Sequence, residues 1–488
     1  MKKKLTAVIL SAAVGMSLVA CSPSEQKKNS KYTIEATLAE DYTLSATVTC
    51  KYVNNTDVPL GELWFHLYPN AYRNGASVAP ISDADISAAY PNGRSYADMQ
   101  ITAVTVGGSA RDITISGVDE NILTVPLGKT LEPTDSINVK ISYTLKLPNV
   151  SHRLGYTDKS VNLGNFYPIA CVYKDGAFVA DPYYSTGDPF FSECADYTVR
   201  FSAPEKWSGA FTGSVKSKSS ADGVTTYNVS AKNVRDFCAV FGEYQKMSGL
   251  AGSTIVNYYY YDDGTPEASL NTSIDAVNTF SKLFGEYPYA EYTVVQTSFL
   301  HGGMEYPCLS MISDKYSGDS YKDIIIHETA HQWWYGAVGN NEVKYAWLDE
   351  ALAEYSTMMF YEVNTEGYSY TFNGKRADAM SAYVLYCETY KEGGMGDTSM
   401  TRAVNEYAND TEYSYMTYVK GALMLDDVRN SVGSSAFKAG LKRYYSTMKF
   451  EIAEPQDLVG AMEKSSKRRL SALFDSWLKG DVKLFSKN

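Results

Sequence analysis

The periodicity of the apolar residues changes once along this chain, near residue 265, and this change constrains the fold more than any other feature. Before it, apolar and polar residues alternate in short runs such as Leu63-Trp64-Phe65-His66-Leu67, a pattern typical of half-buried β-strands. From Pro266 onward, apolar residues recur at helical spacing, with Leu270, Val277 and Phe284 on one stripe. The sequence therefore predicts a β-rich domain followed by a helix-rich one.

Helices dominate the second half of the chain. Longer helical patterns are predicted over residues 321–337, 346–363, 369–391 and 415–431. Two strand-like runs, Tyr292 to Thr297 and Cys308 to Ile312, precede the first of these helices. We therefore place the β domain at residues 32–245 and a mainly helical domain with a few strands at residues 246–488.

Composition excludes several classes of protein. The 488 residues are 44% hydrophobic and 20% charged, which is typical of a folded chain of two or three domains. Its 44 basic and 56 acidic residues give a net charge of −12, and the body of the chain has no basic run. The sequence therefore predicts no binding to nucleic acid.

The N-terminus has the pattern of a secretion signal. Lys2, Lys3 and Lys4 precede an apolar run that ends at Cys21, and the run is too short for a comfortable transmembrane helix. It resembles a bacterial lipoprotein signal, which implies cleavage of residues 1–20, lipidation of Cys21 and a flexible tether over residues 21–31. The alternative is an ordinary signal peptide in which the cysteine is incidental.

Cleavage would also change the charge of the protein. It would remove three lysines and leave 41 basic against 56 acidic residues, a net charge of −15. Such a surface would repel an anionic membrane, so the lipid itself is expected to anchor the protein to the extracytoplasmic face of the cell membrane.

The seven cysteines do not indicate a metal site. Without Cys21, six remain, and they are spread along the chain with no C-x-x-C spacing. Cys50 falls on the apolar side of an alternating run, where a buried free thiol is the simpler interpretation. We predict no particular disulfide.

A metal-binding pattern lies in the segment from Ile324 to Trp334. This segment contains His327 and His331 four positions apart, with Glu328 directly after the first histidine. On a helix, four residues turn through about 400° and rise about 6 Å, so both imidazoles project from nearly one face and can bind one zinc ion. Glu328 can then reach a water molecule at the metal. With only five histidines in the chain, roughly 0.003 such H-E-x-x-H matches are expected by chance.

A third metal ligand is available downstream. Glu350 follows His331 by 19 residues, and a turn with a returning helix would bring it alongside the histidines. The alternative is a solvated acid on a helix face. Glu354, one turn further on, is either an acceptor for the second nitrogen of a ligand histidine or a surface residue.

These motifs together resemble the aminopeptidase N and leukotriene hydrolase family of zinc peptidases. That family has H-E-x-x-H followed after eighteen residues by a glutamate, as here. Three further segments match its other patterns: Gly302-Gly303-Met304-Glu305-Tyr306, Tyr418-Val419-Lys420-Gly421-Ala422 and residues 470–478. The resemblance implies a saddle-like N-terminal β domain followed by a thermolysin-like, mainly helical zinc-peptidase domain with a small edge sheet.

The resemblance also implies roles for the metal-site residues. His327, His331 and Glu350 would bind one Zn²⁺, which lowers the pKa of a bound water toward about 7. Glu328 would take the proton of the attacking water and pass it to the leaving amine. Tyr418 would donate a hydrogen bond to the developing oxyanion.

The assignment of Tyr418 rests on the motif alone, so Tyr413 and Tyr415 are alternatives to it. The specificity of the expected reaction depends on Glu305 and the residues before it. Glu305 would pair with the free α-ammonium of a peptide, while Gly302, Gly303 and Met304 form the segment along which the peptide backbone approaches.

We therefore expect an aminopeptidase that acts on extracytoplasmic peptides with a free N-terminus. A zinc endopeptidase or oligopeptidase with an open cleft is the first alternative. A non-catalytic peptide-binding lipoprotein is the second.

The chain departs from the family pattern in three ways. Tyr306 replaces an asparagine, which changes the first specificity pocket. The family's second anchor for the substrate amine is not evident, and residues 165–190 are the best region for it. The large helical C-terminal domain of full-length relatives has no counterpart, so we expect an open site or one closed by another subunit. Of the other histidines, we expect His301 to be a polar loop residue and His66 and His152 to be structural.

Overall fold

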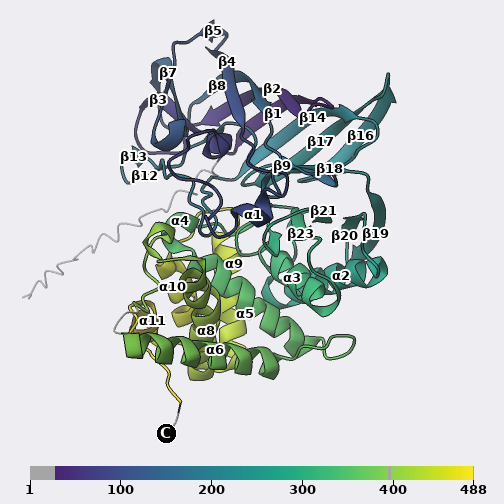
Figure 1. Ribbon diagram of the computed structural model, residues 1–488. Coiled ribbons are helices and arrows are strands. Elements are labelled where there is room, and N and C mark those ends of the chain that lie inside the picture. Colours follow the sequence, from purple (N-terminus) through teal and green to yellow (C-terminus); the bar gives the residue numbers. More distant parts are fainter. Residues whose placement is uncertain (1–27, 394–396, 487–488) are drawn as a thin grey trace, which may run out of the picture.

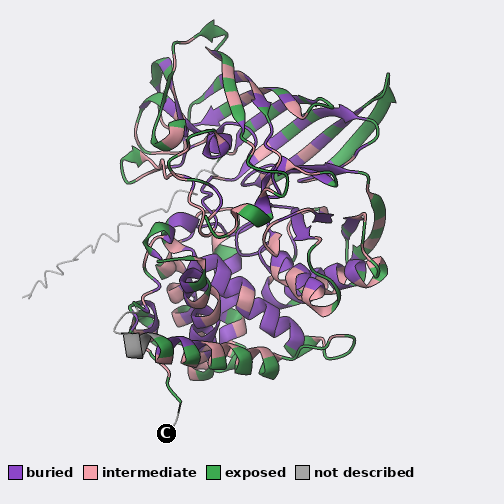
Figure 2. Ribbon diagram, in the orientation of Figure 1, coloured by how far each residue is buried: buried purple, intermediate pink, exposed green. Residues whose placement is uncertain are grey.

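The computed structural model describes residues 28–393 and 397–486. Figure 1 shows two layers, with the strands of the N-terminal half above and the helices of the C-terminal half below. The buried residues form one core in each layer (Figure 2), and buried segments also meet where the layers touch. This arrangement confirms the predicted fold class of a β-rich domain followed by a mainly helical one.

An eight-stranded sheet forms the upper layer. Along β1, every second residue is buried, so one face of the sheet packs on the core and the other faces solvent. The strand order is β16-β17-β14-β1-β2-β8-β4-β5. The strands are β1 (Ser30–Leu38), β2 (Thr43–Val53), β4 (Asp98–Val106), β5 (Ser109–Ala110), β8 (Ser136–Lys146), β14 (Ala195–Pro204), β16 (Ser214–Ala221) and β17 (Val224–Val234).

Two four-stranded sheets share the core of the upper layer with this large sheet. One has the order β15-β18-β10-β9, with β9 (Leu154–Tyr156), β10 (Ser160–Leu163), β15 (Ser208–Phe211) and β18 (Ala239–Gly242). The other has the order β11-β3-β7-β6, with β3 (Leu60–His66), β6 (Thr114–Ser116), β7 (Ile122–Leu131) and β11 (Ile169–Ala170). A short hairpin, β12 (Tyr173–Lys174) and β13 (Ala177–Phe178), and the helix α1 (Ile86–Ala89) complete this layer.

The lower layer combines a small sheet with helices. The sheet has the order β19-β20-β21-β23-β22, with β19 (Gln245–Ala251), β20 (Thr254–Tyr260), β21 (Glu291–Thr297), β22 (Gly303–Met304) and β23 (Leu309–Ser313). The helices are α2 (Pro266–Phe284), α3 (Gly318–Ala330), α4 (Glu342–Tyr345), α5 (Trp347–Val363), α6 (Phe372–Gly393), α7 (Asp410–Ser414), α8 (Gly421–Val432), α9 (Ser434–Met448), α10 (Pro455–Ser466) and α11 (Ser471–Leu478). In the described ranges, no helix is both long and apolar enough to cross a membrane.

One predicted helix is shorter than its sequence pattern. The pattern covers residues 321–337, but α3 ends at Ala330 and a compact turn follows. Tyr335 in this turn has a φ of 141°, which a helix does not allow. His331 caps α3 with helical dihedral angles, φ −62° and ψ −16°, so the helical spacing of the two histidines is kept.

The cysteines agree with the expectation of buried thiols. All six cysteines in the described part of the chain are buried, and none of them forms a disulfide there. Burial raises the pKa of Cys50 to about 12, so its thiol stays protonated and unreactive at neutral pH. Cys21 lies outside the described residues.

Candidate active site

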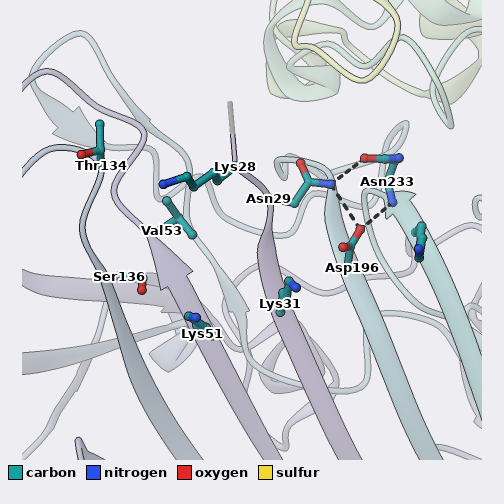
Figure 3. Close-up of a pocket in the computed structure, with 10 residues that line it drawn as sticks. Lys28, Asn29, Lys31, Lys51, Val53, Thr134, Ser136, Asp196 and Asn233 are labelled. Atoms are coloured by element: carbon teal, nitrogen blue, oxygen red, sulfur yellow. Dashed lines mark hydrogen bonds between the residues drawn. The ribbon is translucent and has the colours of Figure 1, made fainter. Parts of the chain in front are cut away.

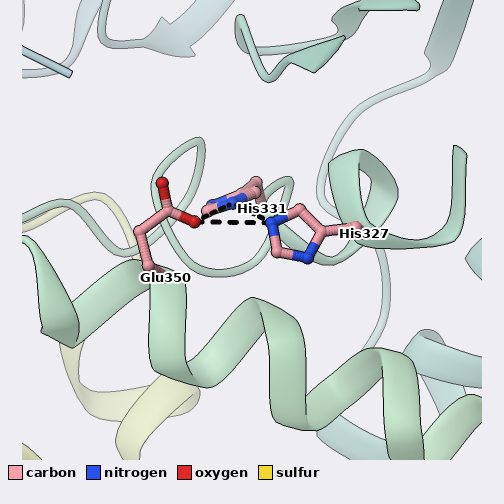
Figure 4. Close-up of side chains that lie close together, drawn as sticks. All are labelled: His327, His331 and Glu350. Atoms are coloured by element: carbon pink, nitrogen blue, oxygen red, sulfur yellow. Dashed lines mark hydrogen bonds and ion pairs between the residues drawn. The ribbon is translucent and has the colours of Figure 1, made fainter. Parts of the chain in front are cut away.

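Two helices bring the three predicted metal ligands together. On α3, His327 and His331 lie one turn apart, and their Nε2 atoms are 3.1 Å from each other. Helix α5 passes alongside, and Oε2 of Glu350 lies 3.2 Å from Nε2 of His331 and 3.4 Å from Nε2 of His327. Figure 4 shows the three side chains converging on one point.

Neighbouring groups leave the Nε2 atoms free to bind a metal. Nδ1 of His331 donates to the backbone oxygen of Trp334 at 2.9 Å, which fixes the ring and directs the lone pair of Nε2 toward Glu350. Nδ1 of His327 lies 3.3 Å from Oε2 of Glu354. Glu354 is itself held by Lys375 at 3.3 Å. The structure thus places Glu354 beside a ligand histidine.

The charges at this point suit a cation. Burial alone would lower the pKa of His327, but Glu350 and Glu354 raise it to about 9. Burial would likewise raise the pKa of Glu350, but His331 and His327 lower it to about 2. The carboxylates therefore draw positive charge to the two Nε2 atoms. Two imidazoles and a carboxylate at this spacing fit one zinc ion and leave a position open for another ligand.

Glu328 lies beside the cluster without being part of it. Its side chain is buried, its Oε2 atom has no hydrogen-bond partner among the described residues, and burial raises its pKa to about 7. A β-carbon on Gly303 would lie 2.4 Å from Oε1 of Glu328, so glycine at this position makes room for the carboxylate. An unpaired carboxylate with a pKa near neutrality suits a general base.

Tyr418 contacts the metal cluster from the opposite side. It lies in a single π-helical turn, Tyr415–Lys420, which is a common distortion at functional sites. Its hydroxyl donates to Oε1 of Glu350, and its ring stacks on His327 with centroids 5.7 Å apart. The structure brings this tyrosine to the site, while Tyr413 also lines the cavity and Tyr415 does not.

The other residues of the tyrosine motif support this turn, a role that the sequence analysis did not assign. Lys420 is fully buried and donates to the backbone oxygens of Thr398 and Trp477 at 2.5 and 2.6 Å. A β-carbon on Gly421 would lie 2.5 Å from that of Ala351, so glycine lets α8 pack closely against α5.

Glu305 enters the same cavity from the loop after β22. It is 4% exposed, and its Oε1 atom has no hydrogen-bond partner among the described residues. Burial, reinforced by the negative charge of Asp188, raises its pKa well above the usual range. Gln332 fixes the loop, because its side chain accepts from the backbone N–H of Cys308 at 2.7 Å and donates to the backbone oxygen of Tyr306 at 3.1 Å. The sequence analysis did not single out Gln332.

The β domain contributes one wall of the cavity. Asp188 falls in the region where a second substrate anchor was expected, and it pairs with Arg153 at 2.5 Å. Nε of Arg153 also lies 3.1 Å from the sulfur of Met304. The cavity has a volume of about 230 Å³. Its lining includes Arg153, Asp188, His301, Gly303, Glu305, His327, Glu328, His331, Glu350 and Tyr418.

The remaining histidines lie outside the metal cluster. His301 lines the cavity, and burial lowers its pKa to about 4. His152 is fully buried, and its Nδ1 atom lies 2.5 Å from the hydroxyl of Tyr72. His66 is buried as well, and its ring stacks on Tyr68.

A buried arginine of the β domain clamps the turn that follows His331. Arg235 donates to the backbone oxygens of Tyr335 at 2.8 Å, Ala337 at 3.3 Å and Glu451 at 2.5 Å, and also to that of Ser192 at 3.1 Å. This fourfold contact joins the two domains directly behind the metal ligands. It also holds the compact turn that follows α3.

Comparison with known families agrees with this geometry. Residues 268–477 match the peptidase family M1 domain, and this range contains all three metal ligands together with Glu305, Glu328 and Tyr418. The chain contains a peptidase family M1 domain. The His327, His331 and Glu350 cluster corresponds to the single catalytic zinc of M1 zinc metallopeptidases.

Several curated M1 proteins are similar to part of this chain. Human Aminopeptidase B is 28% identical over 222 residues, which are 41% of this chain and 32% of that protein. Aminopeptidase N of Lactobacillus delbrueckii subsp. lactis is 24% identical over 260 residues, which are 49% of this chain and 30% of that protein. The chain thus matches about a third of the length of these relatives.

Solved M1 structures are similar over nearly the whole chain. The M1 zinc metallopeptidase of Deinococcus radiodurans has a TM-score of 0.67 at 17% identity, covering 94% of this chain and 96% of that one. A mutant of the same protein bound to a Tyr-Ser-Ala substrate has the same TM-score, identity and coverage. The M1 fold therefore extends through both domains described above.

Proposed function

We propose that this M1 peptidase is a zinc-dependent aminopeptidase that removes N-terminal residues from extracytoplasmic peptides. The observation that carries the proposal is the buried side chain of Glu305, which lies in the same cavity as the metal cluster and whose Oε1 atom has no partner in the described part of the chain. A buried carboxylate without a partner is costly, and the α-ammonium group of a peptide would supply the missing partner.

Each catalytic residue has a position that suits its proposed role. A zinc ion held by His327, His331 and Glu350 would polarise the scissile carbonyl and acidify water. Glu328 accepts the proton of the attacking water on its unpaired Oε2 atom and returns it to the leaving nitrogen. The hydroxyl of Tyr418, which donates to Glu350 here, can turn to the oxyanion of the tetrahedral intermediate.

A peptide with a blocked N-terminus tests this proposal. We expect the zinc-loaded protein to hydrolyse a peptide with a free N-terminus at least about tenfold faster, by kcat/KM, than its N-acetylated form, because acetylation removes the ion pair with Glu305. The variant Glu305→Gln should lose most of this ratio. Equal rates on both peptides would contradict the aminopeptidase assignment and favour an endopeptidase or oligopeptidase.

We further propose that the protein is a lipoprotein of the extracytoplasmic membrane face, anchored through Cys21. The support is the sequence alone: three lysines, an apolar run and a cysteine followed by a polar stretch. Expression of the full chain and of Cys21→Ser in a bacterial host, followed by fractionation and mass spectrometry, tests this. A diacylglyceryl mass on Cys21, with loss of the membrane fraction in the variant, is the expected result. An unmodified Cys21 would contradict it.

A further inference from the structure

Four lysines surround a pocket at one end of the eight-stranded sheet. The pocket has a volume of about 490 Å³, and Lys28, Lys31, Lys51 and Lys232 line it. All four side chains are exposed. The lining contains one acid, Asp196, so its net charge is about three positive charges. Figure 3 shows Lys28, Lys31 and Lys51 around the ends of the central strands.

The fold balances this concentration of charge only in part. Lys31 faces Asp196 on β14, but on its other side it is the direct cross-strand partner of Lys51 on β2, and like charges in such a position are destabilising. Both strands are central in the sheet, so the lysines do not protect an exposed edge. None of the four lysines forms an ion pair with any residue in the described ranges. An anion from outside the chain would offset the repulsion.

The chain enters the fold at this same pocket. The side-chain amide of Asn29 donates to Asp196 at 3.2 Å and to Asn233 at 2.5 Å. Asn55 donates to the backbone oxygen of Lys28 at 3.0 Å. These contacts fix the position of the chain at Lys28 and Asn29. Lys28 is seven residues from Cys21, a span of at most about 25 Å for an extended chain.

We propose that this pocket binds the phosphate groups of anionic phospholipids and holds the β domain against the membrane surface. The proposal rests on the proposed lipid anchor, which would keep the pocket within reach of the bilayer. The chain from Cys21 onward carries a net charge of −15, so most of its surface is repelled by anionic lipids. Because salt screens charges beyond about 10 Å, a locally positive end close to the anchor can approach such lipids closely. The lysines therefore orient the enzyme as well as attract it.

A chemical anchor tests this proposal independently of lipidation in the cell. The chain from Cys21 to Asn488 is coupled to a maleimide lipid at Cys21, the six other cysteines being buried. It is then bound to vesicles of phosphatidylcholine, either alone or with phosphatidylglycerol at roughly 2:1. Acetylation of each lysine by an amine reagent is followed by mass spectrometry.

The expected result is a difference between the two kinds of vesicle. On vesicles with phosphatidylglycerol, acetylation of Lys28, Lys31, Lys51 and Lys232 should slow by roughly fivefold or more, and about 0.5 M NaCl should abolish this protection. The exposed lysines at positions 216, 218 and 442, which lie outside the pocket, should react equally on both. Equal reaction of the pocket lysines on both vesicles would overturn the proposal. Equal protection by free glycerol phosphate in solution would overturn it too, since the ligand would then be a soluble phosphate.

A triple variant with a matched control distinguishes an effect of the pocket lysines from an effect of the net charge of the protein. Lys31→Gln, Lys51→Gln and Lys232→Gln together should restore fast acetylation of Lys28 on anionic vesicles. The control, Lys216→Gln with Lys218→Gln and Lys442→Gln, removes the same charge elsewhere and should leave Lys28 protected. Both variants should keep peptide hydrolysis in solution unchanged. Protection of Lys28 in the first variant, or its loss in the second, would contradict a specific lysine site.

Discussion

The zinc-binding helix has charged side chains on two sides, and the two sides differ in how completely those side chains are paired. Behind the helix, Arg235 donates to four backbone oxygens, so its hydrogen bonds are made within the protein and need no ligand. In the cavity, Glu305 and Glu328 each keep one oxygen atom without a partner among the residues that the structure describes. Buried polar groups normally find partners within the protein. The paired charge of Arg235 therefore stabilises the fold, while the carboxylates of Glu305 and Glu328 are available to metal, water and substrate.

This difference predicts separable effects of substitution. Changes in the cavity should reduce hydrolysis or zinc affinity and leave the folded state nearly as stable. Changes in the clamp should lower the free energy of unfolding.

Among substitutions that leave both cavity glutamates in place, the largest effect on hydrolysis without loss of metal is expected for Tyr418→Phe. Removal of a hydrogen-bond donor to the oxyanion costs about 10²–10³-fold in kcat, with little change in KM. Steady-state kinetics on a free-amine peptide checks this. Tyr415→Phe, in the same π-helical turn but outside the cavity lining, is the matched control. A normal kcat in Tyr418→Phe would exclude the hydroxyl from catalysis.

On the clamp side, we expect Arg235→Met to lower the free energy of unfolding by about 3 kcal/mol, because it removes a donor from four backbone oxygens, of which those of Ala337 and Glu451 keep a backbone N–H partner. Urea unfolding followed by fluorescence measures this loss. The control is Arg200→Met on the exposed face of β14. If both variants unfold alike, the clamp has no structural role.

A smaller effect is expected for Glu354→Gln. Glu354 touches His327 at 3.3 Å but is not one of the three converging ligands, and loss of such a partner typically weakens metal binding by about 10–100-fold. Competition with a zinc chelator gives the affinity. Glu366→Gln, on an exposed loop, should bind zinc normally. Unchanged affinity in Glu354→Gln would show that this contact does not support the metal.

The smallest effect is a pH dependence at the clamp. Oδ2 of Asp236 accepts from the hydroxyl of Tyr335 at 2.5 Å, while burial raises the pKa of Asp236 to about 6. Because the folded state binds this proton more tightly than the unfolded chain, Asp236 lowers stability as pH rises from about 4 to about 6. Asp236→Asn cannot ionise, so its Tm relative to the wild type should rise by a few degrees between pH 4 and pH 7. A constant difference in Tm would contradict the raised pKa.

Sequence reasoning reached the local features and missed those that depend on contacts between domains. The change of period predicted both layers, because alternation and helical spacing are properties of the chain itself. The spacing of His327 and His331 predicted a shared helix face, and Glu350 was found from its distance along the chain. Arg235 and Gln332 carried no local signal, since their partners lie about 100 and 25 residues away. The early end of α3 was missed for the same reason.

The lysine pocket shows a similar limit. Lys28 and Lys31 are neighbours in the sequence, but Lys51 and Lys232 come from two other parts of it, so no single run announced the pocket. Net charge alone predicted repulsion from an anionic membrane. The pairing of β1 with β2 and with β14 gathers these lysines at one corner of the sheet. The net charge of the sequence does not reveal this grouping.

The most direct test of the account measures zinc content and turnover together in Glu328→Gln. Glu328 lies beside the metal cluster but is not one of its ligands, and it is assigned as the base. The account predicts that the purified variant binds one zinc per chain, as the wild type does, and loses about 10²–10⁴-fold in kcat on a free-amine peptide. A variant that keeps its zinc and also keeps full turnover would contradict the proposed mechanism.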